Sequence, residues 1–374
     1  MEILILGGTG AMGKSLVDEL AKRGDTLYIT SRRSIKSENS NVNYIQGNAH
    51  DLNFLRALLS RHYDAIVDFM VYHTKEFEER IHLFLASTDQ YMYLSSCRVY
   101  AQSEEPLREN SDRLYDVCKD SEYLATDEYA LTKAKQENIL MKSGQKNWTI
   151  IRPYITYSNE RMQLGVFEKE EWLYRALKGK PIVFTSDIAA KRTTLTSGKD
   201  VAKAMACLIG NKKAYGEIYH ITGNQSMTWG NILEIYCNAI EKVKGKRPEI
   251  FMLSKAVKTK AIGNLAQLKY DRLYNRMFDN SKIINATDGK IVFEGMEEGL
   301  TKAVTEFIEG QHSFKQIIWK YEARKDRFSG YRTPLSEIPG KKNKINYIVY
   351  RYIPFIGKYI EMIKGSDNYR RLKS

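Results

Sequence analysis

A tyrosine and a lysine four positions apart, Tyr129 and Lys133, have the types and the spacing needed for proton transfer. If this stretch is helical, the two side chains lie about one turn apart on the same face. A tyrosine with its ordinary pKa of about 10 is a poor base at neutral pH, and a neighbouring ammonium group lowers that pKa. The pair therefore predicts a group that removes a proton from a hydroxyl or returns one to it.

The spacing alone does not identify the base, because Tyr-x-x-x-Lys occurs five times in a chain with 25 tyrosines. The five occurrences begin at Tyr115, Tyr129, Tyr174, Tyr321 and Tyr369. Tyr115 is the main rival, but it lies in an acidic stretch, 112–122, without a helical stripe of apolar residues. Tyr129 lies in a stretch, 127–142, with the pattern of a helix, and is the favoured base.

A second chemical feature is a glycine-rich turn between a short apolar run, 2–6, and an amphipathic run, 12–23. The turn reads Gly7-Gly8-Thr9-Gly10-Ala11-Met12-Gly13. We expect Gly7 to permit the tight turn, Gly10 to let the backbone approach phosphates, and Gly13 to let the helix pack closely. The start of the helix adds free N–H groups and a favourable dipole. The turn therefore predicts binding of a dinucleotide pyrophosphate, with a plain structural turn as the alternative.

The elements that must position these residues alternate between strand-like and helix-like runs. We expect strands at 2–6, 26–30, 65–71, 90–95 and 150–152, and helices at 12–23 and 127–142. Strands separated by helices imply right-handed crossovers and a parallel sheet that is covered on both faces. We therefore expect an α/β, Rossmann-type doubly wound parallel sheet. The expected parts are a dinucleotide-binding core over 1–160, a smaller substrate lobe over 161–310 that returns elements to the core, and a C-terminal appendage over 311–374.

These motifs together resemble the extended short-chain dehydrogenase/reductases, the NAD-dependent epimerase/dehydratase family, over residues 1–310. The helix that starts at Tyr129 continues past Lys133 to Glu137, as in the catalytic helix of that family, and Arg152-Pro153 matches the end of its next strand. The segment 95–100, Ser-Ser-Cys-Arg-Val-Tyr, resembles the family's Ser-Ser-x-x-Val-Tyr.

The resemblance implies roles for four of these residues. Tyr129 would transfer the proton, Lys133 would hold the nicotinamide ribose and acidify Tyr129, and Ser96 would hydrogen-bond the reacting oxygen. Ser95 is expected to lie beside the substrate. Dehydratases of this branch carry an acid where this chain has Cys97, so 4,6-dehydration is disfavoured.

The end of the second expected strand bears on the choice of cofactor. NAD sites usually place an acid there to bind the ribose 2′-hydroxyl, but this chain has Ser31, Arg32 and Arg33. Ser31 can donate a hydrogen bond and the arginines can bind a 2′-phosphate, which favours NADP over NAD. Asp51-Leu52 resembles the family's adenine-contacting pair.

Other marks of the family are weaker. Arg192 stands upstream of Asp200-Val201-Ala202, where the family often has a phosphate-binding arginine, and we expect it to contact substrate; a surface arginine is the alternative. His220 lies in an expected late strand and is interpreted as structural. The stretch after Asp68 and the residues after Pro153 depart from the family pattern, which puts the nucleotide part of the substrate in doubt.

Composition excludes several classes of protein. The four cysteines form no CxxC pair and do not cluster with the six histidines, so we expect no metal site, no disulfide framework and a reducing cytoplasm. The start of the chain lacks the basic region of a signal peptide, and no apolar stretch reaches the length of a membrane span. The net charge of +13 permits nucleic acid, anionic lipid or phosphorylated ligands as partners without choosing among them.

Part of the positive charge lies near the end of the chain, where residues 341–374 hold nine Lys or Arg and two Asp or Glu. The stretch 345–363 is aromatic and apolar, with Pro354 and Gly357 interrupting a long helix. Packing against the enzyme's own body or a second subunit is favoured, and a membrane-surface helix or a nucleic-acid patch are the alternatives.

The sequence therefore favours an NAD(P)-dependent epimerase or ketoreductase that acts on a sugar hydroxyl or ketone of a nucleotide sugar. The resemblance also implies a homodimer, and we expect no nucleic-acid partner. The alternative is a catalytically inactive protein of the same fold that senses dinucleotides or binds RNA.

Overall fold

The computed structural model describes residues 1–256 and 265–357, and contacts within the chain divide it into two compact units. The first unit comprises 1–162, 192–228 and 274–303, and the described residues of the second are 163–191, 229–256, 265–273 and 304–357. The expected core, 1–160, is thus joined by two later segments of the expected substrate lobe, while the described residues of the appendage, 311–357, belong to the second unit.

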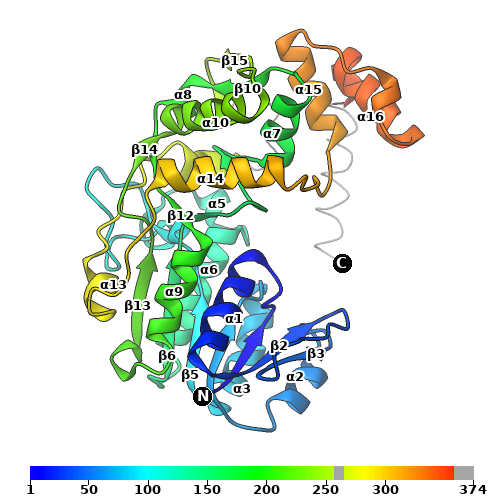
Figure 1. Ribbon diagram of the computed structural model, residues 1–374. Helices are drawn as coiled ribbons and strands as arrows, with labels where there is room; N and C mark the ends of the chain where they lie inside the picture. The colour runs from blue at the N-terminus through cyan, green and yellow to red at the C-terminus, as the bar shows by residue number, and fades with distance from the viewer. Residues whose placement is uncertain (257–264, 358–374) are drawn as a thin grey trace. The chain divides into compact units, whose positions relative to one another are not determined.

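A seven-stranded parallel sheet forms the centre of the first unit (Figure 1). Its order is β13-β6-β5-β4-β1-β2-β3, and each adjacent pair of strands is parallel. The strands are β1 (Glu2–Leu6), β2 (Thr26–Ser31), β3 (Val42–Gln46), β4 (Tyr63–Asp68), β5 (Thr88–Leu94), β6 (Trp148–Pro153) and β13 (Glu217–Ile221). This order confirms the predicted Rossmann-type doubly wound sheet.

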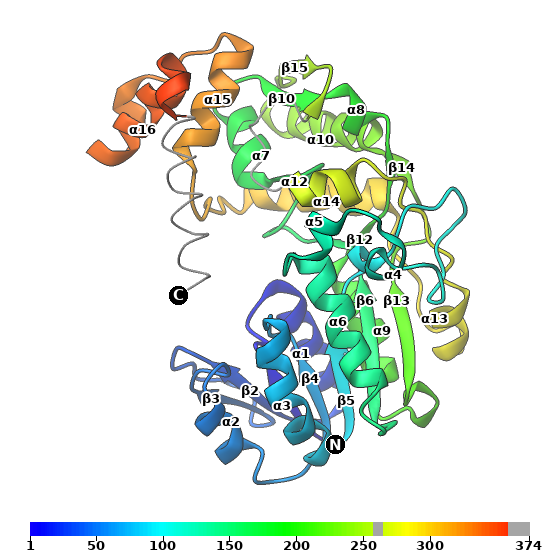
Figure 2. The same cartoon turned by 180° about the vertical axis from the view of Figure 1, so that it is seen from behind.

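Helices cover both faces of this sheet, because its strands are apolar on both sides. Ile3 and Ile5 face the core under α1 and α9, whereas Leu4 and Leu6 face the core under α2, α3 and α6. The helices are α1 (Ala11–Arg23), α2 (Leu52–Leu58), α3 (Thr74–Ala86), α6 (Tyr129–Met141) and α9 (Gly198–Leu208), and Figure 2 shows the side with α3 and α6. Alternation along β1 thus assigns successive side chains to opposite layers.

The remaining elements of the first unit are short. They are α4 (Leu114–Val117), α5 (Ser121–Leu124), α13 (Ser281–Ala286) and the pairs β7 (Ile155–Tyr157) with β12 (Leu195–Ser197) and β11 (Arg192–Thr193) with β14 (Met227–Thr228). The expected strand 65–71 ends earlier, at Asp68, because the Asp68 carboxylate accepts a hydrogen bond from Met70 N, two residues on, at 2.9 Å.

The second unit is built mainly from helices around a small parallel pair of strands. Trp172 and Tyr236 stack in its interior with ring centroids 4.3 Å apart. Its elements are β8 (Gln163–Leu164), β9 (Phe167–Glu168), α7 (Lys169–Leu177), β10 (Ile182–Thr185), α8 (Ser186–Ala189), α10 (Trp229–Lys244), β15 (Ile250–Leu253), α12 (Leu265–Gln267), α15 (Trp319–Ser329) and α16 (Lys341–Tyr352). Helix α14 (Met296–Glu309) begins in the first unit and ends in the second.

The described part of the C-terminal appendage packs within the second unit through buried charges. Arg175 on α7 donates to Glu322 at 2.9 Å and to Asp326 at 2.8 Å, both on α15. Tyr347 on α16 donates to Asp326 at 2.6 Å. This arrangement agrees with the favoured packing alternative, although residues 358–374 of the predicted appendage lie outside the described residues.

Candidate active site

The glycine-rich turn lies between β1 and α1, and three of its glycines occupy positions without room for a side chain. A Cβ on Gly8 would lie 2.7 Å from Ile5 Cγ2. Gly7 has a positive φ of 71° and donates its N–H to Thr30 Oγ1 at 3.0 Å. A Cβ on Gly13 would lie 2.5 Å from the carbonyl oxygen of Gly8. The positive φ of Gly7 agrees with the tight turn predicted there. The close packing predicted at Gly13 is made against the backbone of Gly8, within the turn itself.

The side of the turn at Gly10 is open. A Cβ built on Gly10 meets no heavy atom within 4 Å, and no side chain caps the helix that begins after it. The first turn of α1 also contains no acidic residue. Thr9, Ala11 and Met12 are half-buried around this position. A helix start with free N–H groups and no acid is suited to a diphosphate, so this turn fits the predicted dinucleotide.

The residues predicted to determine the preference between NAD and NADP lie at the end of β2, on the same edge of the sheet as the glycine-rich turn. Ser31 is buried, and its hydroxyl accepts from Arg33 N at 3.1 Å, while the side chains of Arg32 and Arg33 are exposed. Asp51 caps α2 by accepting from Asn53 N at 2.8 Å and Phe54 N at 3.2 Å, with Leu52 half-buried as the first residue of α2.

Tyr129, Lys133 and Ser96 come together where β5 ends and α6 begins. Lys133 is 3% exposed and donates to the carbonyl oxygen of Leu94, the last residue of β5, at 2.6 Å. Its Nζ lies 5.9 Å from the ring centroid of Tyr129. Ser96, two residues beyond Leu94, interacts with the Tyr129 hydroxyl. The three predicted residues therefore share one site, and Tyr115 lies on α4, beside α3 and α6 in a separate groove.

The electrostatics of the tyrosine differ from the expectation. Tyr129 keeps 36% of its surface exposed, yet burial of the hydroxyl raises its pKa, while Arg98 and Ser96 act in the opposite direction. Burial lowers the pKa of Lys133 to about 8, and Asp68 and Glu137 oppose that shift. The pKa of Tyr129 is thus raised rather than lowered, and the ammonium of Lys133 donates to the carbonyl oxygen of Leu94.

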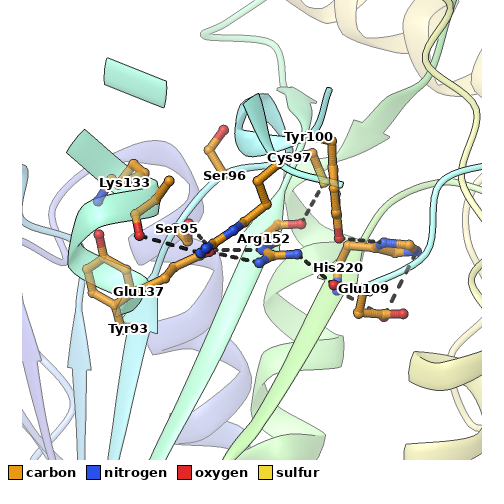
Figure 3. Close-up of polar contacts among 12 residues, drawn as sticks. Tyr93, Ser95, Ser96, Cys97, Tyr100, Glu109, Lys133, Glu137, Arg152 and His220 are labelled. Atoms are coloured by element: carbon orange, nitrogen blue, oxygen red, sulfur yellow. Dashed lines mark hydrogen bonds and ion pairs between the residues drawn. The ribbon is translucent and has the colours of Figure 1, made fainter. Parts of the chain in front are cut away.

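Glu137, one turn after Lys133, organises a buried network that the sequence analysis did not predict (Figure 3). Its carboxylate accepts from Arg152 Nε at 2.7 Å and Nη2 at 2.8 Å, from Ser95 Oγ at 2.6 Å and from Arg113 Nη1 at 3.1 Å. Burial opposes the charge, but Arg152, Ser95 and Arg113 together outweigh it and the pKa of Glu137 is lowered. The spacing of Glu137 from Lys133 and the Arg152-Pro153 motif were both visible in the sequence, whereas their pairing was not.

This network changes the interpretation of Ser95. The Ser95 side chain is 2% exposed and its hydroxyl is used by Glu137, so the predicted substrate contact is not supported. Ser95 joins the end of β5 to α6 instead.

His220 is also part of the interior. Its ring nitrogens lie 3.3 Å from Tyr100 Oη and 2.8 Å from the carbonyl oxygen of Asp279, and the side chain is fully buried (Figure 3). Burial lowers the pKa of His220, which favours the neutral ring. The structural interpretation of His220 is confirmed.

Arg192 lies on β11, at an exposed position. Its guanidinium contacts Ser226, with Nη2 donating to the backbone carbonyl at 2.5 Å and to the hydroxyl at 3.1 Å. The structure therefore holds the Arg192 side chain against its own chain, and the substrate contact stays a prediction.

Asp68 is a second buried acid near Lys133, and no role is predicted for it from the sequence. Its carboxylate accepts from the Tyr91 hydroxyl at 2.7 Å at the end of β4. Burial raises the pKa of Asp68 to about 6, although hydrogen bonds from Tyr91 and Met70 and the charge of Lys133 oppose the shift. The stretch that departs from the family pattern thus begins with a buried acid, and the charge of Asp68 acts to raise the pKa of Lys133.

Comparison with known families decides the assignment. The model of the "NAD dependent epimerase/dehydratase family" matches residues 3–222, more than half of the chain. The chain belongs to this family. The resemblance to the extended short-chain dehydrogenases is thereby confirmed.

A relative from Arabidopsis thaliana, "chloroplast stem-loop binding protein of 41 kDa b", is 29% identical over 255 residues. This match covers 64% of the chain and 63% of the relative, so the chain spans less than two thirds of that relative's length.

Solved structures of similar fold include two Bacillus enzymes. The dTDP-glucose 4,6-dehydratase of Bacillus anthracis, crystallised with NAD, is 17% identical with a TM-score of 0.64, over 85% of this chain and 100% of that one. The UDP-glucuronic acid 4-epimerase of Bacillus cereus, in complex with UDP-glucuronic acid and NAD, is 16% identical with a TM-score of 0.64, over 83% and 100%. At this identity the likeness shows the fold.

Across residues 1–256 and 265–357, no helix is long and apolar enough to span a membrane.

Proposed function

We propose that the chain is an NAD(P)-dependent epimerase or ketoreductase that acts on a hydroxyl or ketone of a nucleotide sugar. The observation that carries the proposal is the meeting of Ser96, Tyr129 and Lys133 at the end of β5, on the same edge of the sheet as the open turn at Gly10. Family membership supports the same class of reaction.

Each residue has a distinct task in this mechanism. The backbone from Gly7 to Gly13 and the start of α1 would hold the pyrophosphate, and Lys133 the nicotinamide ribose. The cofactor, when bound, accepts a hydride from the substrate carbon or returns one. Tyr129 takes the hydroxyl proton during oxidation and gives it back during reduction, while Ser96 donates a hydrogen bond to the same oxygen. Holding both reactants in fixed positions supplies much of the rate.

The test is a screen of UDP- and dTDP-linked sugars with the purified full chain and NAD⁺, NADH or NADPH, followed by absorbance at the reduced-nicotinamide band and by NMR of the sugar product. We expect Tyr129→Phe to reduce turnover by about 10²-fold or more while cofactor binding is kept. Full activity in Tyr129→Phe would contradict the proposal. Tyr115→Phe is the matched control, because it removes the hydroxyl of the rival motif.

We also propose that NADP is preferred over NAD. The exposed guanidinium groups of Arg32 and Arg33 at the end of β2 support this preference, since no acid stands there to repel a 2′-phosphate. Titration with each cofactor tests it: Arg32→Ala combined with Arg33→Ala is expected to weaken NADP⁺ binding and leave NAD⁺ binding nearly unchanged. Tighter binding of NAD⁺ by the unmodified chain would overturn the preference.

A second candidate function is RNA binding on the same fold. The name of the Arabidopsis relative and the net charge of +13 favour it. It predicts RNA retention that falls steeply with salt and does not change in Tyr129→Phe. Gel-shift titration of the unmodified chain and of Tyr129→Phe with a stem-loop RNA at two salt concentrations tests this function. The hydride-transfer proposal instead predicts loss of enzymatic activity in Tyr129→Phe.

A further inference from the structure

Arg98 is held rigidly between the end of β5 and the start of α6. Its backbone N–H donates to Ser96 Oγ at 3.2 Å, and its guanidinium pairs with Glu128 Oε1 at 2.5 Å. Both side chains of this ion pair are nearly buried, at 11% and 12% exposed. Arg98 therefore contacts Ser96 at the end of β5 and Glu128 at the start of α6.

Glu128, the partner of Arg98, is itself fixed as the residue that caps α6. Its second carboxylate oxygen accepts from Ala130 N at 2.8 Å and from the Tyr123 hydroxyl at 3.0 Å. Because Tyr129 follows Glu128 directly, this clamp places the guanidinium next to the tyrosine ring. The distance from Arg98 Cζ to the centroid of the Tyr129 ring is 5.3 Å.

Arg98 is closer to the tyrosine ring than the lysine of the motif is. Lys133 Nζ lies 5.9 Å from the same centroid, and its ammonium donates to the carbonyl oxygen of Leu94 and faces the ring of Tyr93, 4.6 Å away. Among the groups that act on Tyr129, burial is the largest and raises its pKa, and Arg98 is the strongest that lowers it. Among the charged groups around the tyrosine, an arginine from the Ser-Ser-Cys-Arg segment therefore has the largest effect.

We propose that Arg98 is a positioning residue for Tyr129, which orients the ring and stabilises the negative charge that develops on its oxygen during proton transfer. The inference rests on the proposed function, in which Tyr129 is the base. The charged groups that face Tyr129 are Arg98 and Glu128 beside it, Arg161 after β7, and Lys133 on α6, with Ser96 and Tyr93 as uncharged neighbours from β5 and its end. Glu128 opposes Arg98, so the two members of the ion pair have effects of opposite sign on the tyrosine.

The test titrates Tyr129 directly and needs no substrate. A difluorotyrosine placed at position 129 of the full chain is more acidic than tyrosine, which brings its titration into the range where the protein stays folded, and its ¹⁹F NMR signal reports that one phenol. We expect Arg98→Gln to raise the pKa of this group by about one unit, since an opposite charge at this distance typically contributes a shift of that size. Arg98→Lys keeps the charge and is expected to restore part of the shift.

Two further variants keep the outcome decisive. Glu128→Gln retains an oxygen for capping α6 but removes the negative charge, and is expected to lower the pKa at position 129. Arg108→Gln is the matched control, because Arg108 is a well-exposed arginine whose ion pair is with Asp279, and it is expected to change nothing. Thermal unfolding of each variant verifies the fold.

An unchanged titration in Arg98→Gln with the fold retained would overturn the proposal. If a substrate is found, the alkaline rise of kcat/KM is expected to move with the same shift, about tenfold in rate at neutral pH for each pKa unit. If the sugar screen finds no hydride transfer but the titration shifts as expected, the proposed function fails while the electrostatic link between Arg98 and Tyr129 stands.

Discussion

Arg152 on β6 and Glu137 on α6 form a buried ion pair with two hydrogen bonds, Nε to Oε1 at 2.7 Å and Nη2 to Oε2 at 2.8 Å. The side chains are 2% and 0% exposed. The pair joins the helix that carries Tyr129 and Lys133 to the sheet on which it lies.

Removing one member of this pair is expected to destabilise the chain strongly. Arg152→Met leaves the Glu137 carboxylate buried without its main partner, which costs about 3–5 kcal/mol in the free energy of unfolding. Denaturant unfolding followed by circular dichroism measures this loss. Lys282→Met is the matched control: its pair with Glu217 is partly exposed, so we expect about 1 kcal/mol or less. Similar losses in the two variants would contradict the prediction.

Alanine is expected to affect mainly cofactor binding at one glycine of the turn between β1 and α1 and mainly stability at another. Gly10→Ala adds a Cβ where no atom lies within 4 Å, so stability falls by about 1 kcal/mol or less, while dinucleotide affinity falls about tenfold or more. Gly13→Ala places its Cβ 2.5 Å from the Gly8 carbonyl oxygen and is expected to cost about 1–3 kcal/mol in stability. Thermal unfolding and calorimetric titration with NAD⁺ measure both effects. Unchanged affinity in Gly10→Ala would argue against a phosphate cradle at this turn.

Lys133→Met is expected to stabilise the protein at neutral pH while abolishing turnover. Burial lowers the pKa of Lys133 from 10.5 to about 8, a shift worth about 3 kcal/mol. Because the unfolded chain binds the proton more tightly, this cost is fully present below about pH 8 and disappears as the pH rises toward 10.5. Unfolding of both proteins should therefore show a gain for the variant at pH 7 that shrinks at pH 9 and above. A variant that is less stable at pH 7 would refute this, and would mean that the hydrogen bond to Leu94 outweighs burial.

Membrane-surface contact by the C-terminal appendage stays a prediction, and α16 offers a way to test it. Ile345, Ile348 and Tyr352 lie at helical spacing with 61%, 36% and 51% exposed, and residues 338–357 contain four Lys or Arg and no acid. If an anionic bilayer is the partner, the chain should sediment with vesicles that contain phosphatidylglycerol and not with pure phosphatidylcholine. Ile345→Ser is then expected to weaken binding about tenfold.

The control for the vesicle experiment is Val292→Ser, which removes a valine that is 81% exposed in the first unit. Absence of binding at low salt would eliminate the membrane alternative. Light scattering of the same samples tests the predicted homodimer.

Local pattern was sufficient to predict five of the seven strands of the parallel sheet and the two helices that carry the candidate site. Short-range pattern determines the apolar run before Gly7, the glycine spacing and the amphipathic helix that follows. These features can therefore be predicted directly from the sequence. The Tyr129–Lys133 spacing likewise depends on one helical turn. These features predicted α1, α6, the glycine-rich turn between β1 and α1, and the three residues that meet at the end of β5.

Only the tertiary structure decided which charges surround those residues. Glu137 pairs with Arg152 because α6 lies on β6, and Arg98 reaches Tyr129 because the end of β5 meets the start of α6. Ser95 is used by Glu137 for the same reason. Such pairings join elements that are distant in sequence, and burial sets both their strength and the pKa values that result. Residue types and spacing therefore predict the proton-transfer group, whereas the packing of α6 against the sheet determines its electrostatic environment.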